Sequence, residues 1–182
     1  MRFPDFLRTT VLICAASATL LGVVALAGAN GTGNDTVVPV AAGWWLLTAL
    51  AGAWIGRRAT TSSPIASLLA AARTRSSLPE LHPGRTVLNR LWPLLMLTTG
   101  AAAVAFVLPQ VPAIVAGGPI ICALAWRRQA AAVTAIEERD GARFYIEPTS
   151  PLQPIRLVRT PGFRSNLMEM TGATRPTVQR SA

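Results

Sequence analysis

The chain has 182 residues, of which 51% are hydrophobic. Only 14% are charged, below the roughly 25% usual in soluble domains, and this excludes an ordinary soluble domain. The net charge is +9 and all 17 basic residues are arginine. Because these arginines flank long apolar segments, we expect anionic lipid headgroups, and not nucleic acid, to be their counterions.

The N-terminal part predicts a first transmembrane hairpin over residues 1–56. Residues 1–8 form a short basic start, and residues 11–29 then carry no charge. About 19 residues rising about 1.5 Å each match a hydrocarbon core of about 30 Å. A second apolar span covers residues 37–56. A small-x-small triplet at 27–29 leaves open that the first segment is a cleaved signal peptide, although its length favours an uncleaved span.

The second span ends in a Gly-x-x-x-Gly pair, Gly52 and Gly56. Two glycines at this spacing allow another helix to approach closely. We interpret both residues as helix-packing positions. Packing within the same bundle is favoured, and dimerisation is the alternative.

Residues 57–90 form a polar loop that is rich in arginine. Ser63 and Pro64 are typical of a helix start. The following residues, 65–75, have apolar side chains on one face and predict a short amphipathic helix. This helix would lie on the membrane surface, on a partner or on its own bundle.

The next stretch, residues 91–139, predicts a second transmembrane hairpin with a helical extension. Its spans cover 91–108 and 113–126, joined by a tight uncharged turn, and the extension reaches Arg139. Gly117-Gly118-Pro119 interrupts the last span and predicts a kink. A broken helix can mark a transport site, but no charge lies at this depth.

The C-terminal part alternates apolar and polar residues over 143–147 and 155–159. This pattern predicts a β-hairpin within residues 140–164, followed by a disordered tail over 165–182. An isolated two-stranded hairpin is marginally stable, so it needs a platform. We therefore interpret its apolar residues as partner contacts: Phe144, Tyr145, Ile146, Ile155, Leu157 and Val158.

The arginines also predict the orientation. They occur at the N-terminus, in the central loop and after the fourth span, and the two connections within the hairpins have none. The positive-inside rule then places the loop and both termini on the cytoplasmic side of the inner membrane. The arginines at the span ends are expected to contact anionic lipid: Arg57, Arg58, Arg127 and Arg128.

No combination of residues predicts catalysis, a cofactor site or a metal site, so we do not expect an enzyme. The single histidine, His82, precedes a proline in the loop, and no acidic residue lies inside a span. Cys14 and Cys122 lie in apolar segments and are interpreted as small buried hydrophobes. The acidic run at 137–140 is either a solvated helix end or a docking patch for a basic partner.

Residues 138–147 (Glu-Arg-Asp-Gly-Ala-Arg-Phe-Tyr-Ile-Glu) and 154–163 (Pro-Ile-Arg-Leu-Val-Arg-Thr-Pro-Gly-Phe) resemble the tail of small actinobacterial transmembrane proteins. The resemblance is to the lipid-uptake coordinator group, which accompanies the Mce (mammalian cell entry) lipid importers of mycobacteria. It implies an accessory subunit that contacts the permease or ATPase of a fatty-acid or sterol importer, without catalysis. The alternative is a small homo-oligomeric transporter or channel.

Overall fold

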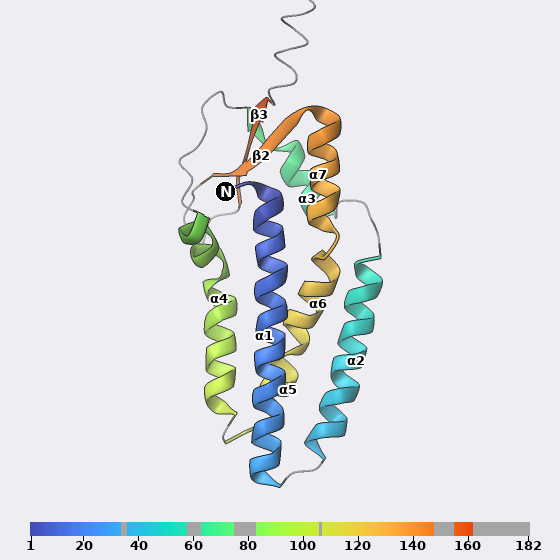
Figure 1. The fold of residues 1–182 in the computed structure, drawn as a ribbon, viewed down its shortest axis with the longest axis vertical. Coiled ribbons are helices and arrows are strands. Elements are labelled where there is room, and N and C mark those ends of the chain that lie inside the picture. Colours follow the sequence, from blue (N-terminus) through green and yellow to red (C-terminus); the bar gives the residue numbers. More distant parts are fainter. Residues whose placement is uncertain (34–35, 58–62, 75–82, 106, 148–154, 162–182) are drawn as a thin grey trace, which may run out of the picture.

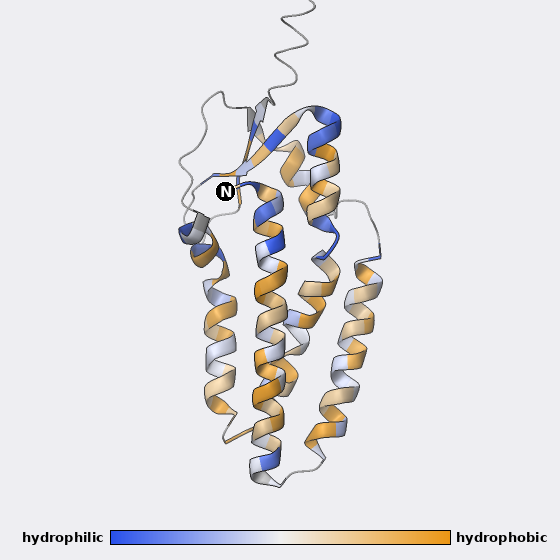
Figure 2. Ribbon diagram, viewed as in Figure 1, coloured by the Kyte–Doolittle hydropathy of each residue, from blue (hydrophilic) through white to orange (hydrophobic). Residues whose placement is uncertain are grey.

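The computed structural model describes residues 1–33, 36–57, 63–74, 83–105, 107–147 and 155–161. The protein is mostly helical, and four of its helical segments are long and apolar enough to cross a membrane. These segments run alongside one another, with a small α/β subdomain at one end (Figure 1). Figure 2 shows that the four segments are predominantly apolar along their length. The predicted tail 165–182, Arg58 and His82 lie outside the described residues.

The first two spans are α1 (Phe3–Thr32) and α2 (Val37–Ile55). Most of the basic start at residues 1–8 belongs to the first helix, because α1 begins at Phe3 with a proline in its first turn. Proline suits this position, since its missing N–H would have no helical partner there. Gly33 ends α1 at φ 64°, a conformation that glycine adopts without strain.

The remaining helices of the bundle are α4 (Pro83–Val104), α5 (Gln110–Val115), α6 (Gly117–Trp126) and α7 (Gln129–Asp140). The predicted interruption is present, because α5 and α6 are separate helices that meet at Ala116. The predicted tight turn is shorter than expected, since α5 already begins at Gln110. The helical extension ends at Gly141 in a left-handed conformation, φ 60°.

The helices do not pack mainly in chain order. Helix α6 contacts both α1 and α2 extensively, while α1 and α2 contact each other only slightly. Helix α4 contacts α1 and α5 on the other side of the bundle (Figure 1). The broken helix α5–α6 is therefore the element that holds α2 to the rest of the protein.

The α/β subdomain comprises α3 (Ser63–Ala70), β1 (Arg73–Thr74), α7, β2 (Ala142–Ile146) and β3 (Leu157–Pro161), with the start of α1. Strands β2 and β3 are antiparallel, which confirms the predicted C-terminal pairing. Strand β1 adds a parallel neighbour to β3, giving the order β1-β3-β2. The expectation that the amphipathic helix reaches residue 75 is wrong, because the backbone of 73–74 pairs with β3.

Candidate functional site: the α/β subdomain

The apolar core of the subdomain joins segments that are far apart in the sequence. Residues from the start of α1, from α3 and α7, and from β2 and β3 form one buried cluster: Phe3, Phe6, Leu7, Ile65, Ala130, Val133, Phe144, Ile146 and Leu157. The first turns of α1, helix α3 and the buried face of α7 thus form the platform on which the sheet packs. An isolated two-stranded hairpin is only marginally stable in water, and here packing against the helices stabilises the strands.

A single carboxylate connects three of these segments. Glu137 on α7 is 5% exposed, and its Oε2 accepts a hydrogen bond of 2.7 Å from Nη2 of Arg2. Its Oε1 accepts a hydrogen bond of 2.8 Å from the backbone N–H of Phe144 at the centre of β2. The two oxygens therefore fix the N-terminus and the sheet to the same turn of α7. The hydrogen bond between Arg2 and Glu137 is the main reason why the pKa of the Arg2 guanidinium is raised.

The N-terminal residues also extend the sheet. Arg2 forms an antiparallel bridge with Tyr145, and the carbonyl of Met1 accepts a hydrogen bond of 3.1 Å from the N–H of Ile146. An open strand edge exposes unpaired backbone groups that invite pairing with other chains. Here the start of the chain lies along the outer edge of β2 and pairs with it. The N-terminus is consequently part of the subdomain as well as of the first span.

The sequence predicted six apolar residues of the hairpin as partner contacts. Five of them are buried within the chain, between 1% and 6% exposed: Phe144, Tyr145, Ile146, Leu157 and Val158. Ile155 is partly buried and packs against the same apolar cluster. Contact with a partner stays a prediction for these residues, and their observed contacts are intramolecular.

The exposed surface of the subdomain carries charge instead. Arg143 on β2, Arg159 on β3 and Arg156 just before β3 are exposed. Within the acidic run, Glu138 and Asp140 are exposed, and Asp140 accepts a hydrogen bond of 2.8 Å from Nε of its neighbour Arg139. The interpretation of this run as a solvated helix end is therefore wrong for Glu137, which faces the core.

Sequence reasoning missed Glu137, although a signal for it exists. Ala130, Val133 and Glu137 are spaced three and four residues apart, so they lie on one face of a helix. The first two are apolar and buried, and Glu137 continues their face. A lone acid on the apolar face of a helix predicts a buried charge with a partner, but only the tertiary structure identifies Arg2 as that partner.

Gly52 and Gly56 lie where α2 meets α6. A Cβ atom at Gly52 would lie 3.0 Å from the Cα of Ile121, and one at Gly56 would contact the carbonyl oxygen of Leu124. The two helices therefore approach so closely that only glycine fits at these positions.

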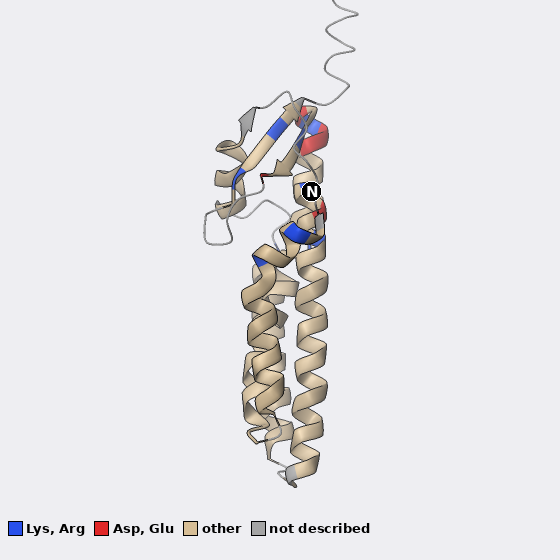
Figure 3. Ribbon diagram, turned by 90° about the vertical axis from the view of Figure 1, so that its left-hand side faces the viewer, with Lys and Arg blue, Asp and Glu red and all other residues tan. Residues whose placement is uncertain are grey.

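Of the residues predicted to contact lipid, Arg57, Arg127 and Arg128 are exposed near the ends of α2 and α6. Nη1 of Arg128 donates a hydrogen bond of 3.3 Å to the carbonyl of Arg57. Figure 3 shows the charged residues gathered at the subdomain end, with none along the middle of the described spans. Three of the predicted lipid-contacting arginines thus lie at one level of the bundle, next to the subdomain.

Among the described residues, no group of three or more histidine, cysteine, aspartate or glutamate side chains could hold a metal ion. No family model, no curated protein and no solved structure matches this chain. These comparisons therefore assign no family to the chain.

Proposed function

We propose that the protein is an accessory subunit of a multi-protein lipid importer of the Mce type, acting through protein contacts. The observation that carries the proposal is the continuity between the subdomain and the spans. Helix α1 begins in the core of the subdomain, and α7 follows α6 after only two residues. A partner that binds the subdomain would therefore also position two spans.

In this proposal the subdomain, the central loop and both termini lie on the cytoplasmic side of the inner membrane. The distribution of arginine supports this orientation, because all 17 lie outside the apolar segments and none lies in either connection at the opposite end. Fusion of a reporter that is active only in the cytoplasm to residue 161 should give signal. Fusion of the same reporter within residues 33–36 should give none, and the reverse pattern would contradict the orientation.

The proposed docking surface is the face of the sheet that carries Arg143, together with the exposed Arg156 just before β3. These side chains can pair with carboxylates of a permease or ATPase without disturbing the buried core, and charged rim residues tune partner choice and association rate. The lipid-transport assignment itself rests on the resemblance of residues 138–147 and 154–163 to the tail of the coordinator group.

Affinity purification in mild detergent tests the proposal. The wild-type protein should recover a permease or ATPase of a lipid importer. The double variant Arg143→Glu/Arg156→Glu should lose this partner, while the matched Arg143→Lys/Arg156→Lys should retain it. Recovery of the protein alone, or flux through vesicles that contain only the purified protein, would favour the homo-oligomeric transporter instead.

A further inference from the structure

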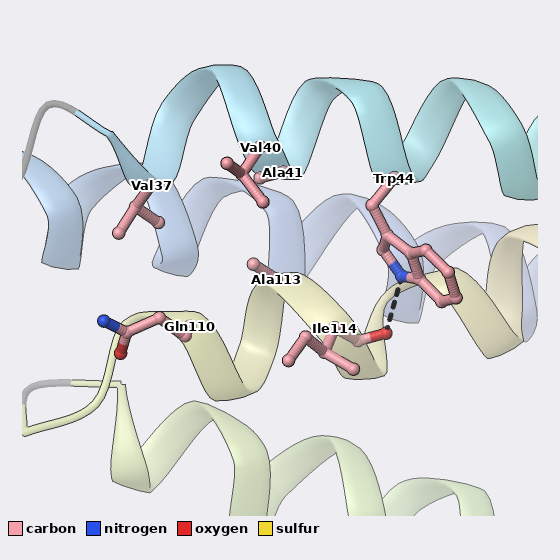
Figure 4. Close-up of a pocket in the computed structure, with 7 residues that line it drawn as sticks. All are labelled: Val37, Val40, Ala41, Trp44, Gln110, Ala113 and Ile114. Atoms are coloured by element: carbon pink, nitrogen blue, oxygen red, sulfur yellow. Dashed lines mark hydrogen bonds between the residues drawn. The ribbon is translucent and has the colours of Figure 1, made fainter.

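A groove lies between α2 and α5, at the end of the bundle away from the α/β subdomain (Figure 4). Its volume is about 400 Å³, in the range of small-molecule sites. Val40 and Trp44 line it from α2, and Ala113 and Ile114 line it from α5. Val40 and Ile114 are 72% and 62% exposed, so the groove opens sideways from the bundle toward the surrounding membrane.

Two tryptophans of α2 bond the end of α5, close to the break between α5 and α6. Nε1 of Trp44 donates a hydrogen bond of 3.1 Å to the carbonyl of Ile114, and Nε1 of Trp45 donates one of 2.8 Å to the carbonyl of Ala113. Both bonds join α2 to the last turn of α5, where hydrogen bonds replace the water that the membrane lacks. A Cβ atom at Gly117 would lie 2.6 Å from Nε1 of Trp44, so glycine leaves the space in which the ring lies.

The shape and lining of the groove suit an acyl chain. From Val37 to Trp44, α2 rises about 10 Å along the groove. The lining side chains are apolar except for the amide of Gln110 and the indole N–H of Trp44, and this N–H already donates to the Ile114 carbonyl. An extended acyl chain can therefore lie along the groove without leaving that N–H unpaired.

The absence of basic residues at this end of the bundle favours a lipid without net negative charge. There is no basic residue between Arg8 and Arg57 or between Arg90 and Arg127. An anionic headgroup at this end would find no counter-charge in either stretch. The side-chain amide of Gln110 lies at the mouth of the groove and can donate to an ester or hydroxyl oxygen (Figure 4).

The geometry points to a binding site for one acyl chain of a zwitterionic or uncharged membrane lipid, in the groove between α2 and α5. The site uses none of the subdomain residues and needs no partner subunit. It is therefore separate from the proposed docking function, and either can fail without the other.

Photolabelling of the full chain tests the site. The protein is placed in phosphatidylcholine nanodiscs in which a small fraction of the phosphatidylcholine carries a diazirine on one acyl chain. After irradiation, fragment-ion mass spectrometry should locate the adducts around Val40 and Ile114. Leu46, which is 63% exposed and does not line the groove, should be labelled much less.

Two matched substitutions complete the test. Val40→Trp fills the groove from an exposed position and should lower labelling at Ile114 by at least about threefold. Leu46→Trp adds the same side chain outside the groove and should leave that labelling unchanged. If Val40→Trp does not fold, Ile114→Trp fills the site from the other helix. Labelling is then measured at Val40. Equal labelling of Leu46 and Val40 would overturn the proposal. Equal effects of Val40→Trp and Leu46→Trp on labelling at Ile114 would also overturn it. So would a covalent protein dimer in place of the lipid adduct.

Discussion

Arg2 and Glu137 form an ion pair with 2.7 Å between Nη2 and Oε2, although 135 positions separate them in the chain. The side chain of Glu137 is 4% exposed and that of Arg2 is 39% exposed. The carboxylate is thus shielded from water while its partner reaches the surface. Because Glu137 also accepts the Phe144 N–H, the pair determines how the first span, α7 and the sheet are joined.

Substitution of Glu137 by Gln should weaken this joint. The amide keeps the size of the side chain but loses the charge that pairs with Arg2, and one of its two polar ends becomes a donor. We expect a loss of about 1.5–3 kcal/mol in unfolding free energy, as for other hydrogen bonds to charged groups. Thermal unfolding in detergent and hydrogen exchange at β2 would measure it.

Glu138→Gln is the matched control, because Glu138 is next to Glu137 in the chain and its carboxylate is exposed. It should change stability by less than about 0.5 kcal/mol. Equal effects at the two positions would contradict the role assigned to Glu137.

Leu7→Ala should destabilise the subdomain more than the membrane spans. Leu7 is 2% exposed and lies in the cluster that joins α1 to the sheet. Truncation of a buried leucine typically costs about 2–5 kcal/mol. Limited proteolysis should cut the variant between α7 and β3 faster than the wild type. Leu12→Ala, at a position 68% exposed on the same helix, should not change the rate.

Gly56→Ala should push α2 away from α6. The added methyl group would collide with the backbone carbonyl of Leu124, which cannot move as a flexible side chain would. Overpacking of this kind typically costs about 1–3 kcal/mol, measurable as a lower midpoint of thermal unfolding. Gly43→Ala has open space within 4 Å and should stabilise the helix slightly. A destabilised Gly43→Ala beside an unaffected Gly56→Ala would refute the close approach.

Trp45→Phe should destabilise the broken helix. Phenylalanine keeps an aromatic ring but removes the N–H that donates to the Ala113 carbonyl. We expect a loss of about 0.5–2 kcal/mol, the range of interhelical hydrogen bonds in membranes. The readout is steric-trap or thermal unfolding in the same detergent. Trp54→Phe, at a site 71% exposed, is the control and should behave like the wild type.

Several elements could be predicted because their causes are local. The interruption between α5 and α6 follows from Gly117-Gly118-Pro119, and the end of α7 follows from Gly141. The alternation at 143–147 predicted β2, since side chains of a strand point to opposite faces in turn. Strand β1 could not be predicted, because two residues show no pattern and become a strand only through pairing with β3.

The sequence by itself determined the four apolar spans, because the length and polarity of a bilayer constrain each segment independently. It also determined the C-terminal strands and the positions of the charges along the chain. Only the tertiary structure decided that α2 packs on α6, that Met1 and Arg2 pair with β2, and that Glu137 pairs with Arg2. These features depend on contacts between segments that are far apart in the chain. A local sequence pattern does not determine which distant segments pack together.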